Sequence, residues 1–327
     1  MRSSIAASLL AFLALPFAWS QMAISVRSGL LHHVEGQAEL DGKPVTPKPG
    51  EFPMVNPGST LATQDGKAEI LLAPGAFLRL APNTSVIMLS SALSDTRVEI
   101  LNGTALVEVA DLPKDTSIAV RIAGSDTYVK SHGLYEFDGN AARLRVFDGK
   151  AQINRPTPGE KPLTAKKGRE VLLAAPKLET AKFNTKESQS TLYAWSENRS
   201  MRIAQTNLVA ARSAQKSGLR LPSSGWAFYP SWGMYTFLPR SGLFASPFGW
   251  NWYSPGSIWQ YGLYSPYYGY PGGYYGGYPR SNRNWEGLGS RRPMGGGSVG
   301  MGRGASSTGG GGGAARAPMS GGRGRGR

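Results

Sequence analysis

The sequence contains no cysteine among its 327 residues. Disulfide bonds, thiolate metal sites and cysteine nucleophiles are therefore excluded, and so is a lipid anchor attached to a processed N-terminal cysteine. An exported protein of this composition has to obtain its stability from packing alone.

Acidic residues are also scarce, because 21 Asp and Glu stand against 36 Lys and Arg and leave a formal charge of +15. The excess lies toward the C-terminus, where residues 220–327 hold 11 Arg, no Lys and a single acid, Glu286. This segment carries +10 of the formal charge. The high isoelectric point therefore describes the tail more than a folded core.

Long apolar runs are missing except at the N-terminus. Arg2 precedes an apolar run over residues 5–17, and Ala18-Trp19-Ser20 places small residues where a signal peptidase reads them. The run is shorter than the roughly 20 residues that span a bilayer. We expect residues 1–20 to be a signal peptide cleaved near Ser20, which makes the protein periplasmic or secreted. A retained anchor is the alternative, and the mature chain is expected to have no transmembrane helix and at most peripheral membrane contact.

The few histidines suggest no chemical site. His32 and His33 are adjacent, and neighbouring side chains of a strand point to opposite faces, which makes them poor joint metal ligands. No Gly-x-Ser-x-Gly nucleophile motif occurs. The sequence therefore predicts no metal, no cofactor and no catalytic residue, as expected of a non-enzymatic protein.

The chain does repeat one short phrase, in which Gly, a small or polar residue and Ala open an alternating segment. The four copies begin at Gly36, Gly66, Gly103 and Gly149. Asn102 and Asp148 precede the last two copies. Asn-Gly and Asp-Gly between alternating runs are strong hairpin signals, because both turn positions must tolerate positive φ. We therefore predict a β-hairpin turn at each of these glycines.

Residues 21–175 are predicted to form one β-domain. Strand-like runs recur there at intervals of about 8–12 residues, separated by turn residues such as Pro74-Gly75. This spacing predicts a mainly β fold, either a β-sandwich or a short β-solenoid. A segment of about 150 residues can bury an adequate core without disulfides.

Three motifs in this domain follow one another in a characteristic order. They are Gly58-Ser59-Thr60-Leu61-Ala62-Thr63, Gly66-Lys67-Ala68-Glu69-Ile70 and Leu78-Arg79-Leu80-Ala81-Pro82-Asn83-Thr84. Together with the later segments at Gly103 and from Arg143 to Ala151, this order resembles the FecR domain, over roughly residues 58–155. The matching positions are turn glycines and apolar strand residues.

The resemblance implies an exported β-domain used for sensing or protein interaction. In signalling members of the family, the domain lies in the periplasm behind a transmembrane helix, and a cytoplasmic N-terminal segment binds a sigma factor. No such segment precedes the export signal in this sequence. A direct anti-sigma role is therefore not expected.

Residues 176–218 are predicted to be a linker followed by an amphipathic helix. Asn184, with Glu187 three residues later, suggests an N-terminal cap, and Gly218 suggests the stop. The helix is expected to dock on the β-domain through Leu192 and Trp195. A helix lying on a membrane surface is the alternative.

Residues 219–260 are rich in aromatic side chains, because five of the eight tryptophans lie within them. The segment resembles the C-terminal part of exported FecR-domain proteins of acidobacterial type. It is expected to pack on the β-domain as a strap, to meet a partner or membrane, or to stack on sugar rings. In the last two cases Trp250 and Trp252 are the candidate contacts.

Residues 261–327 are of low complexity, first rich in Tyr and Gly and then in Gly and Arg. Such a segment buries too little apolar area to fold, so we predict disorder. Arg323, Arg325 and Arg327 are candidate contacts to a polyanionic surface such as lipid headgroups or acidic polysaccharide. Nucleic acid is not the expected ligand behind an export signal. A merely solubilising tail is the alternative.

Taken together, the residues and the resemblance predict a binding or scaffolding module of the cell envelope with an unidentified envelope protein or polyanion as partner. Two alternatives stay open: a sensory or regulatory component of a trans-envelope signalling system, and polyanion or polysaccharide binding through the tail.

Overall fold

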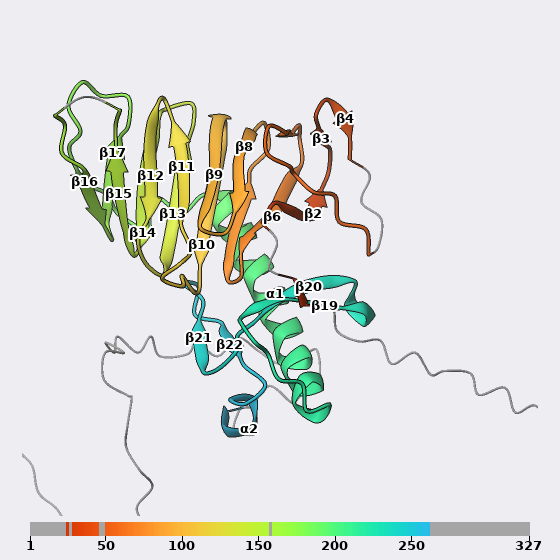
Figure 1. Cartoon of the computed structure of the whole chain (residues 1–327). Coiled ribbons are helices and arrows are strands. Elements are labelled where there is room, and N and C mark those ends of the chain that lie inside the picture. The colour runs from red at the N-terminus through yellow and green to blue at the C-terminus, as the bar shows by residue number, and fades with distance from the viewer. Residues whose placement is uncertain (1–23, 26–27, 46–49, 157–158, 262–327) are drawn as a thin grey trace, which may run out of the picture. The chain divides into compact units, whose positions relative to one another are not determined.

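A computed structural model describes residues 24–25, 28–45, 50–156 and 159–261 of the chain (Figure 1). The predicted signal peptide lies outside the described residues. So does the tail from residue 262 on, with Arg323, Arg325 and Arg327. No helix within the described ranges is both long enough and apolar enough to cross a membrane.

Two β-sheets pack face to face and form a sandwich (Figure 1). In spatial order, the eight-stranded sheet consists of β18 (Ala181–Lys182), β17 (Arg169–Leu172), β14 (Arg143–Asp148), β13 (Gly133–Asp138), β10 (Thr104–Val109), β7 (Ala76–Leu80), β6 (Lys67–Ala73) and β2 (Leu30–Glu35). The nine-stranded sheet consists of β16 (Leu163–Lys166), β15 (Lys150–Asn154), β12 (Ser125–Val129), β11 (Ile118–Ile122), β9 (Asp95–Asn102), β8 (Ser85–Ala92), β5 (Thr60–Thr63), β3 (Ala38–Leu40) and β4 (Lys43–Pro44).

The main core fills the space between the two sheets. Alternate residues of each strand point into it, as Val98 and Ile100 of β9 and Val107 and Val109 of β10 illustrate. The paired strands of the sandwich run antiparallel, apart from β9 and β11, which run parallel. The predicted mainly β fold is confirmed, and of its two forms the chain adopts the sandwich.

The four glycine phrases are not hairpins, and here the sequence prediction is wrong. At Gly36 the chain passes from β2 to β3, at Gly66 from β5 to β6, at Gly103 from β9 to β10, and at Gly149 from β14 to β15. In every case the two strands belong to different sheets. The phrase therefore marks a corner at which the chain changes sheet, while the true hairpins lie elsewhere, for example at the Pro74-Gly75 turn between β6 and β7.

These corners need glycine for two reasons. Gly36, Gly103 and Gly149 have positive φ, as predicted. Gly66 does not, but a Cβ atom there would lie 2.5 Å from the carbonyl oxygen of Gln37. A Cβ at Gly103 would likewise lie 2.5 Å from the carbonyl oxygen of Asn83. Close approach of neighbouring backbone thus fixes glycine at the corners, even where the dihedral angle does not.

The strands of the sandwich do not coincide with residues 21–175. The eight-stranded sheet continues to β18 at Lys182. At the other end, β1 (Ile24–Ser25) pairs with β19 (Gly225–Tyr229), a strand of the aromatic C-terminal segment. The start of the described chain is therefore joined to the aromatic segment.

Helix α1 (Thr191–Lys216) begins later than predicted. Its N-cap is Ser190, whose hydroxyl accepts a hydrogen bond from the backbone N–H of Tyr193 at 3.2 Å. Asn184 instead closes a local turn by accepting from the N–H of Lys186. The helix ends at Lys216, and Gly218 follows with φ of 67°, as a stop signal should.

Helix α1 and the aromatic segment cover the outer face of the eight-stranded sheet. The segment consists of β19, a 3-10 turn (Pro230–Trp232), β20 (Met234–Leu238), β21 (Leu243–Ala245), β22 (Asn251–Tyr253) and α2 (Ile258–Tyr261). A second core forms where Phe77 of the sheet, Ile203 of α1 and the side chains of Trp226, Phe237 and Trp252 meet. The aromatic segment is therefore an integral part of the described fold.

Candidate functional site: a buried polar network under helix α1

Charged residues occupy the sheet face that α1 covers. Glu69 on β6, Arg79 on β7 and Glu108 on β10 lie between residues that point into the main core, so their own side chains point outward, toward the helix. All three are completely buried, because α1 and the aromatic segment lie over them. Burial of charge is expensive unless every charge is paired.

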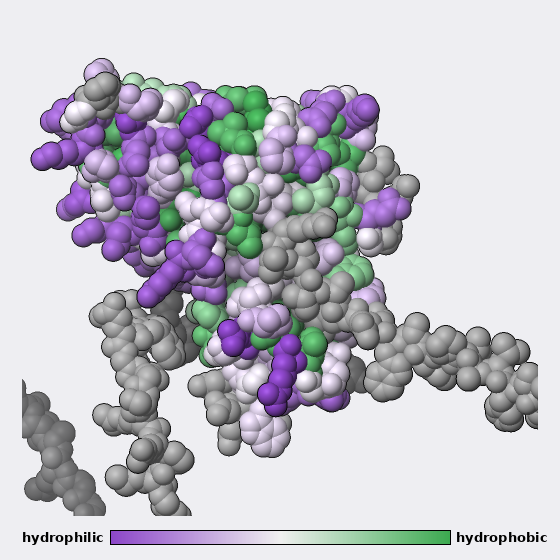
Figure 2. Space-filling model, viewed as in Figure 1, coloured by the Kyte–Doolittle hydropathy of each residue, from purple (hydrophilic) through white to green (hydrophobic). Residues whose placement is uncertain are grey.

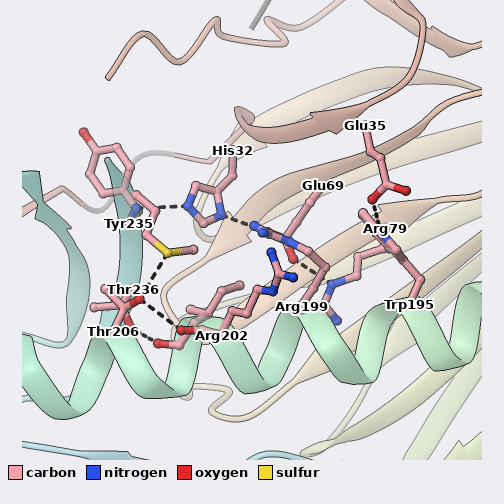
Figure 3. A network of polar contacts seen from close by, with 12 residues as sticks. His32, Glu35, Glu69, Arg79, Trp195, Arg199, Arg202, Thr206, Tyr235 and Thr236 are labelled. Atoms are coloured by element: carbon pink, nitrogen blue, oxygen red, sulfur yellow. Dashed lines mark hydrogen bonds and ion pairs between the residues drawn. The ribbon is translucent and has the colours of Figure 1, made fainter. Parts of the chain in front are cut away.

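Arg79 links the two buried carboxylates, and Figure 3 shows it beside Glu69. Its Nε donates to Glu69 Oε2 at 2.7 Å, and its Nη1 donates to Glu108 Oε2 at 2.6 Å. From the helix, Arg199 Nη2 donates to Glu69 Oε1, also at 2.7 Å. Two arginines thus balance two carboxylates, so the buried charges are compensated.

His32 completes the network on the β2 side. Its Nδ1 lies 2.8 Å from Glu69 Oε1, and its Nε2 lies 2.9 Å from the backbone nitrogen of Tyr235, whose N–H it must accept (Figure 3). This arrangement requires a neutral imidazole that carries its proton on Nδ1. Burial agrees with it, since burial lowers the pKa of His32. Burial also acts to raise the pKa of Glu69, but Arg199 and Arg79 outweigh it and hold that pKa well below the usual range.

Serine hydroxyls add hydrogen bonds to Glu108 and to a further carboxylate, Glu136. Ser200 of α1 donates to Glu108 Oε1 at 2.7 Å, and Ser246, which follows β21, donates to the same oxygen. At the start of the helix, Ser190 donates to Glu136 of β13 at 3.0 Å. Together with His32, the sheet therefore binds α1 and the aromatic segment through polar contacts on four of its strands, β2, β6, β10 and β13.

The network is suited to holding α1 on the sheet rather than to proton transfer. Both ring nitrogens of His32 are engaged, and the two serines contact a carboxylate instead of an imidazole. A nucleophile would need a neighbouring base with a free lone pair. The chemistry that this arrangement supports is the fixed placement of α1 on the sheet.

The two adjacent histidines do not point to opposite faces, which corrects the sequence expectation. A bulge in β2 between Leu31 and His33 shifts the register, and both rings lie on the α1 side. His33 stacks on Trp195 with ring centroids 6.2 Å apart. Even so, no cluster of three or more potential metal-ligating side chains occurs in the described part of the chain.

The candidate contact residues in the aromatic segment turn inward. Trp252 is fully buried and stacks on Phe77 with ring centroids 5.9 Å apart. Trp250 is half-buried at the edge of the same core. In this conformation Trp252 presents no surface to a partner. The predicted docking of the helix through Leu192 and Trp195 is seen, with Leu192 buried and Trp195 Nε1 donating to Glu35 at 2.7 Å.

Sequence reasoning missed the network itself. A signal was present, because Glu69 and Arg79 are single charges inside otherwise apolar runs. A strand buried on both faces has such a near-continuous apolar pattern, so a charge within it has to find a buried partner.

Comparison with family models agrees with the resemblance. The family model described as FecR protein matches residues 59–152. Two crystal structures of a proposed anti-sigma factor from Parabacteroides distasonis, at 2.50 and 1.65 Å, are 14% identical to this chain, with TM-scores of 0.33 and 0.34. The matches cover 39% and 42% of this chain and 61% and 64% of those chains, less than two thirds of their length.

No curated protein matches the chain. The family match runs from the start of β5 into β15 and includes the central strands of both sheets. Residues 59–152 thus match the FecR family model.

Proposed function

We propose that this protein is a non-enzymatic binding module of the FecR type that acts in the cell envelope. The observation that carries the proposal is the FecR match over residues 59–152, which includes the central strands of both sheets. The outer face of the eight-stranded sheet is occupied by α1 and the aromatic segment. Among the described residues, no helix lies over the outer face of the nine-stranded sheet, and we propose that this face receives a protein partner.

That open face offers mixed chemistry (Figure 2). Leu101 at the end of β9 keeps 49% of its surface exposed, and Ile87 of β8, which lies opposite Glu99 of β9, is half-buried. Apolar side chains ringed by charged ones are typical of protein-binding surfaces. A regulatory use of the binding is favoured by the FecR match, and a scaffolding use is the alternative.

Photo-crosslinking in the producing cell tests the binding surface. A photoreactive residue at Leu101 is expected to give a covalent adduct with one discrete host protein. The same residue at Glu197, on the exposed side of α1, serves as the control. An adduct pattern that is the same at both positions, or no adduct at Leu101, would overturn the proposed surface.

Gene deletion separates the two uses of the module. If the protein is a regulatory component, deletion of its gene is expected to change a defined set of transcripts. If it is a scaffold, deletion is expected to remove a protein complex and to leave the transcripts unchanged.

The envelope location is part of the proposal and has its own test. Mass spectrometry of the mature N-terminus is expected to find a start at Gln21, with the protein in the periplasmic or secreted fraction. An intact Met1 in a membrane fraction that resists a high-salt wash would mean a retained anchor.

A further inference from the structure

Three lysines form a row across neighbouring strands of the nine-stranded sheet. Lys150 of β15 lies directly opposite Lys166 of β16. On the other side of β15, the backbone N–H of Lys130, just beyond β12, donates to the carbonyl oxygen of Lys150 at 2.9 Å. Neighbouring strands of a sheet lie about 4.8 Å apart. The row therefore places one lysine side chain on each of three neighbouring strand positions.

The row lies on the open side of the sheet. Val129, Ala151 and Ala165 precede or follow the lysines and are buried in the main core, and successive side chains of a strand alternate between faces. All three lysines are exposed. Figure 2 shows strongly hydrophilic residues over the part of the molecule that β12, β15 and β16 occupy in Figure 1.

Like charges at directly opposed positions destabilise a sheet. None of the three ammonium groups has a carboxylate partner within the described residues, whereas nearby Lys167 pairs with Asp148 at 2.9 Å. The same end of the sandwich holds a second like-charged pair, because Arg169 of β17 lies opposite Lys182 of β18. A row of exposed ammonium groups without carboxylate partners creates a local positive potential, which attracts an anion.

A second row of neutral groups runs beside the lysines on the same face. Tyr128 lies opposite Gln152, and Gln152 lies opposite Thr164. Each of these residues is two positions from a lysine of the first row, so the two rows are parallel. The ring centroid of Tyr128 is 5.0 Å from the Nζ atom of Lys130. The surface thus combines a line of cations, a line of hydrogen-bonding groups and one aromatic face.

We propose that these two rows are a binding site for an acidic polysaccharide. Carboxylate groups of the sugar units would pair with Lys130, Lys150 and Lys166, hydroxyl groups would bond to Gln152 and Thr164, and one sugar ring would lie on Tyr128. Single-stranded nucleic acid fits less well, because its bases stack on several successive aromatic side chains. A lipid surface would call for apolar residues within the rows, and they hold none. This site is separate from the cationic tail and from the protein partner proposed above.

Binding of polygalacturonate to the full-length mature protein tests the site. Because the tail also carries positive charge, the comparison is between variants of equal net charge. The row variant Lys130→Gln/Lys150→Gln/Lys166→Gln is expected to weaken binding at least about tenfold. The matched variant Lys43→Gln/Lys114→Gln/Lys216→Gln removes three exposed lysines elsewhere and is expected to change binding less than about twofold.

Two further measurements make the outcome decisive. Tyr128→Ala is expected to weaken polygalacturonate binding severalfold and to leave binding of a poly-dT oligonucleotide unchanged. The row variant is expected to unfold at the same urea concentration as the wild type or a higher one, since it removes repulsion. The proposal would be overturned if the two triple variants lost affinity equally, or if the row variant bound polygalacturonate as well as the wild type. It would also be overturned if the row variant lost more affinity for poly-dT than for polygalacturonate.

Discussion

The two outer faces of the sandwich carry similar residue types in different settings. On the eight-stranded sheet, Glu69, Arg79 and Glu108 are completely buried under α1 and the aromatic segment. On the nine-stranded sheet, Arg121 and Asp126 pair at 2.7 Å but stay partly exposed, and Lys150 is exposed without a carboxylate partner in the described ranges.

The difference shows that burial, rather than residue type, decides what a charge does in this fold. A buried charge that loses its partner destabilises the protein strongly. The charges on the outer face of the eight-stranded sheet are therefore needed to hold α1 in place. Exposed pairs contribute little to stability, so the second face is free to vary and to bind.

The largest difference between the two faces is expected when Arg79, which pairs with both Glu69 and Glu108, is removed. Arg79→Met leaves two buried carboxylates without their shared partner, so we expect the free energy of unfolding to fall by about 3–5 kcal/mol. Urea denaturation at pH 7 measures it. Arg121→Met on the open face is the control, with an expected loss of about 0–1 kcal/mol. Similar losses for the two variants would contradict the distinction between the faces.

A second prediction concerns the corners that join the two faces. In Gly103→Ala the new methyl group would meet the Asn83 carbonyl oxygen at 2.5 Å and the residue would keep positive φ, so we expect a loss of about 2–4 kcal/mol. Gly124 also has positive φ but has no atom within 4 Å of an added Cβ. Gly124→Ala is therefore the control, with an expected loss of about 1 kcal/mol. Equal losses in urea melts would mean that φ alone requires glycine at Gly103.

The corners also show how far the sequence predicts the fold. Alternation and turn residues were enough to predict a β-sandwich as one of two forms. The dipeptides Asn102-Gly103 and Asp148-Gly149 indicate a local reversal of φ, but they do not say whether the next strand joins the same sheet. That choice depends on which face of the following strand is buried, which is a property of the whole sandwich.

The buried network was beyond sequence reasoning for a similar cause. Arg199 and Glu69 are 130 positions apart, and only the docking of α1 brings them within 2.7 Å. The histidines at positions 32 and 33 were misplaced because a bulge in β2 changes the side on which a residue lies. Local patterns predict elements well, and long-range pairing and bulges decide the site.

A third prediction concerns how the stability of the protein depends on pH through His33, on the face that α1 covers. Burial lowers the pKa of His33 from 6.5 to about 4, so the folded protein keeps this ring neutral while the unfolded chain protonates it. Stability from His33 is therefore complete above pH 6.5 and is lost as the pH falls toward 4. We expect the unfolding free energy to decrease by about 1–3 kcal/mol over this range.

The variant His33→Gln is expected to flatten this pH dependence, while His32, whose pKa is also lowered by burial, still contributes in the same direction. Glu69 adds to the loss only below about pH 4.5, where the unfolded chain protonates this carboxyl while its depressed pKa keeps it ionised in the folded state. Urea melts at several pH values measure the slope. A slope equal to that of the wild type would show that His33 is not held neutral.

The smallest expected effect comes from the exposed rim of the network, where the two settings meet. Trp195 Nε1 donates to Glu35 at 2.7 Å, and this hydrogen bond is the main cause that lowers the pKa of that carboxyl. Trp195→Phe keeps most of the ring but removes the donor, so we expect a loss of about 0.5–1 kcal/mol. The pKa of Glu35, followed by NMR titration, should rise toward its ordinary value. Glu35→Gln retains an acceptor for the indole N–H and serves as the control for stability. A loss as large as that of Arg79→Met would show that this exposed contact stabilises the protein as much as the buried ion pairs do.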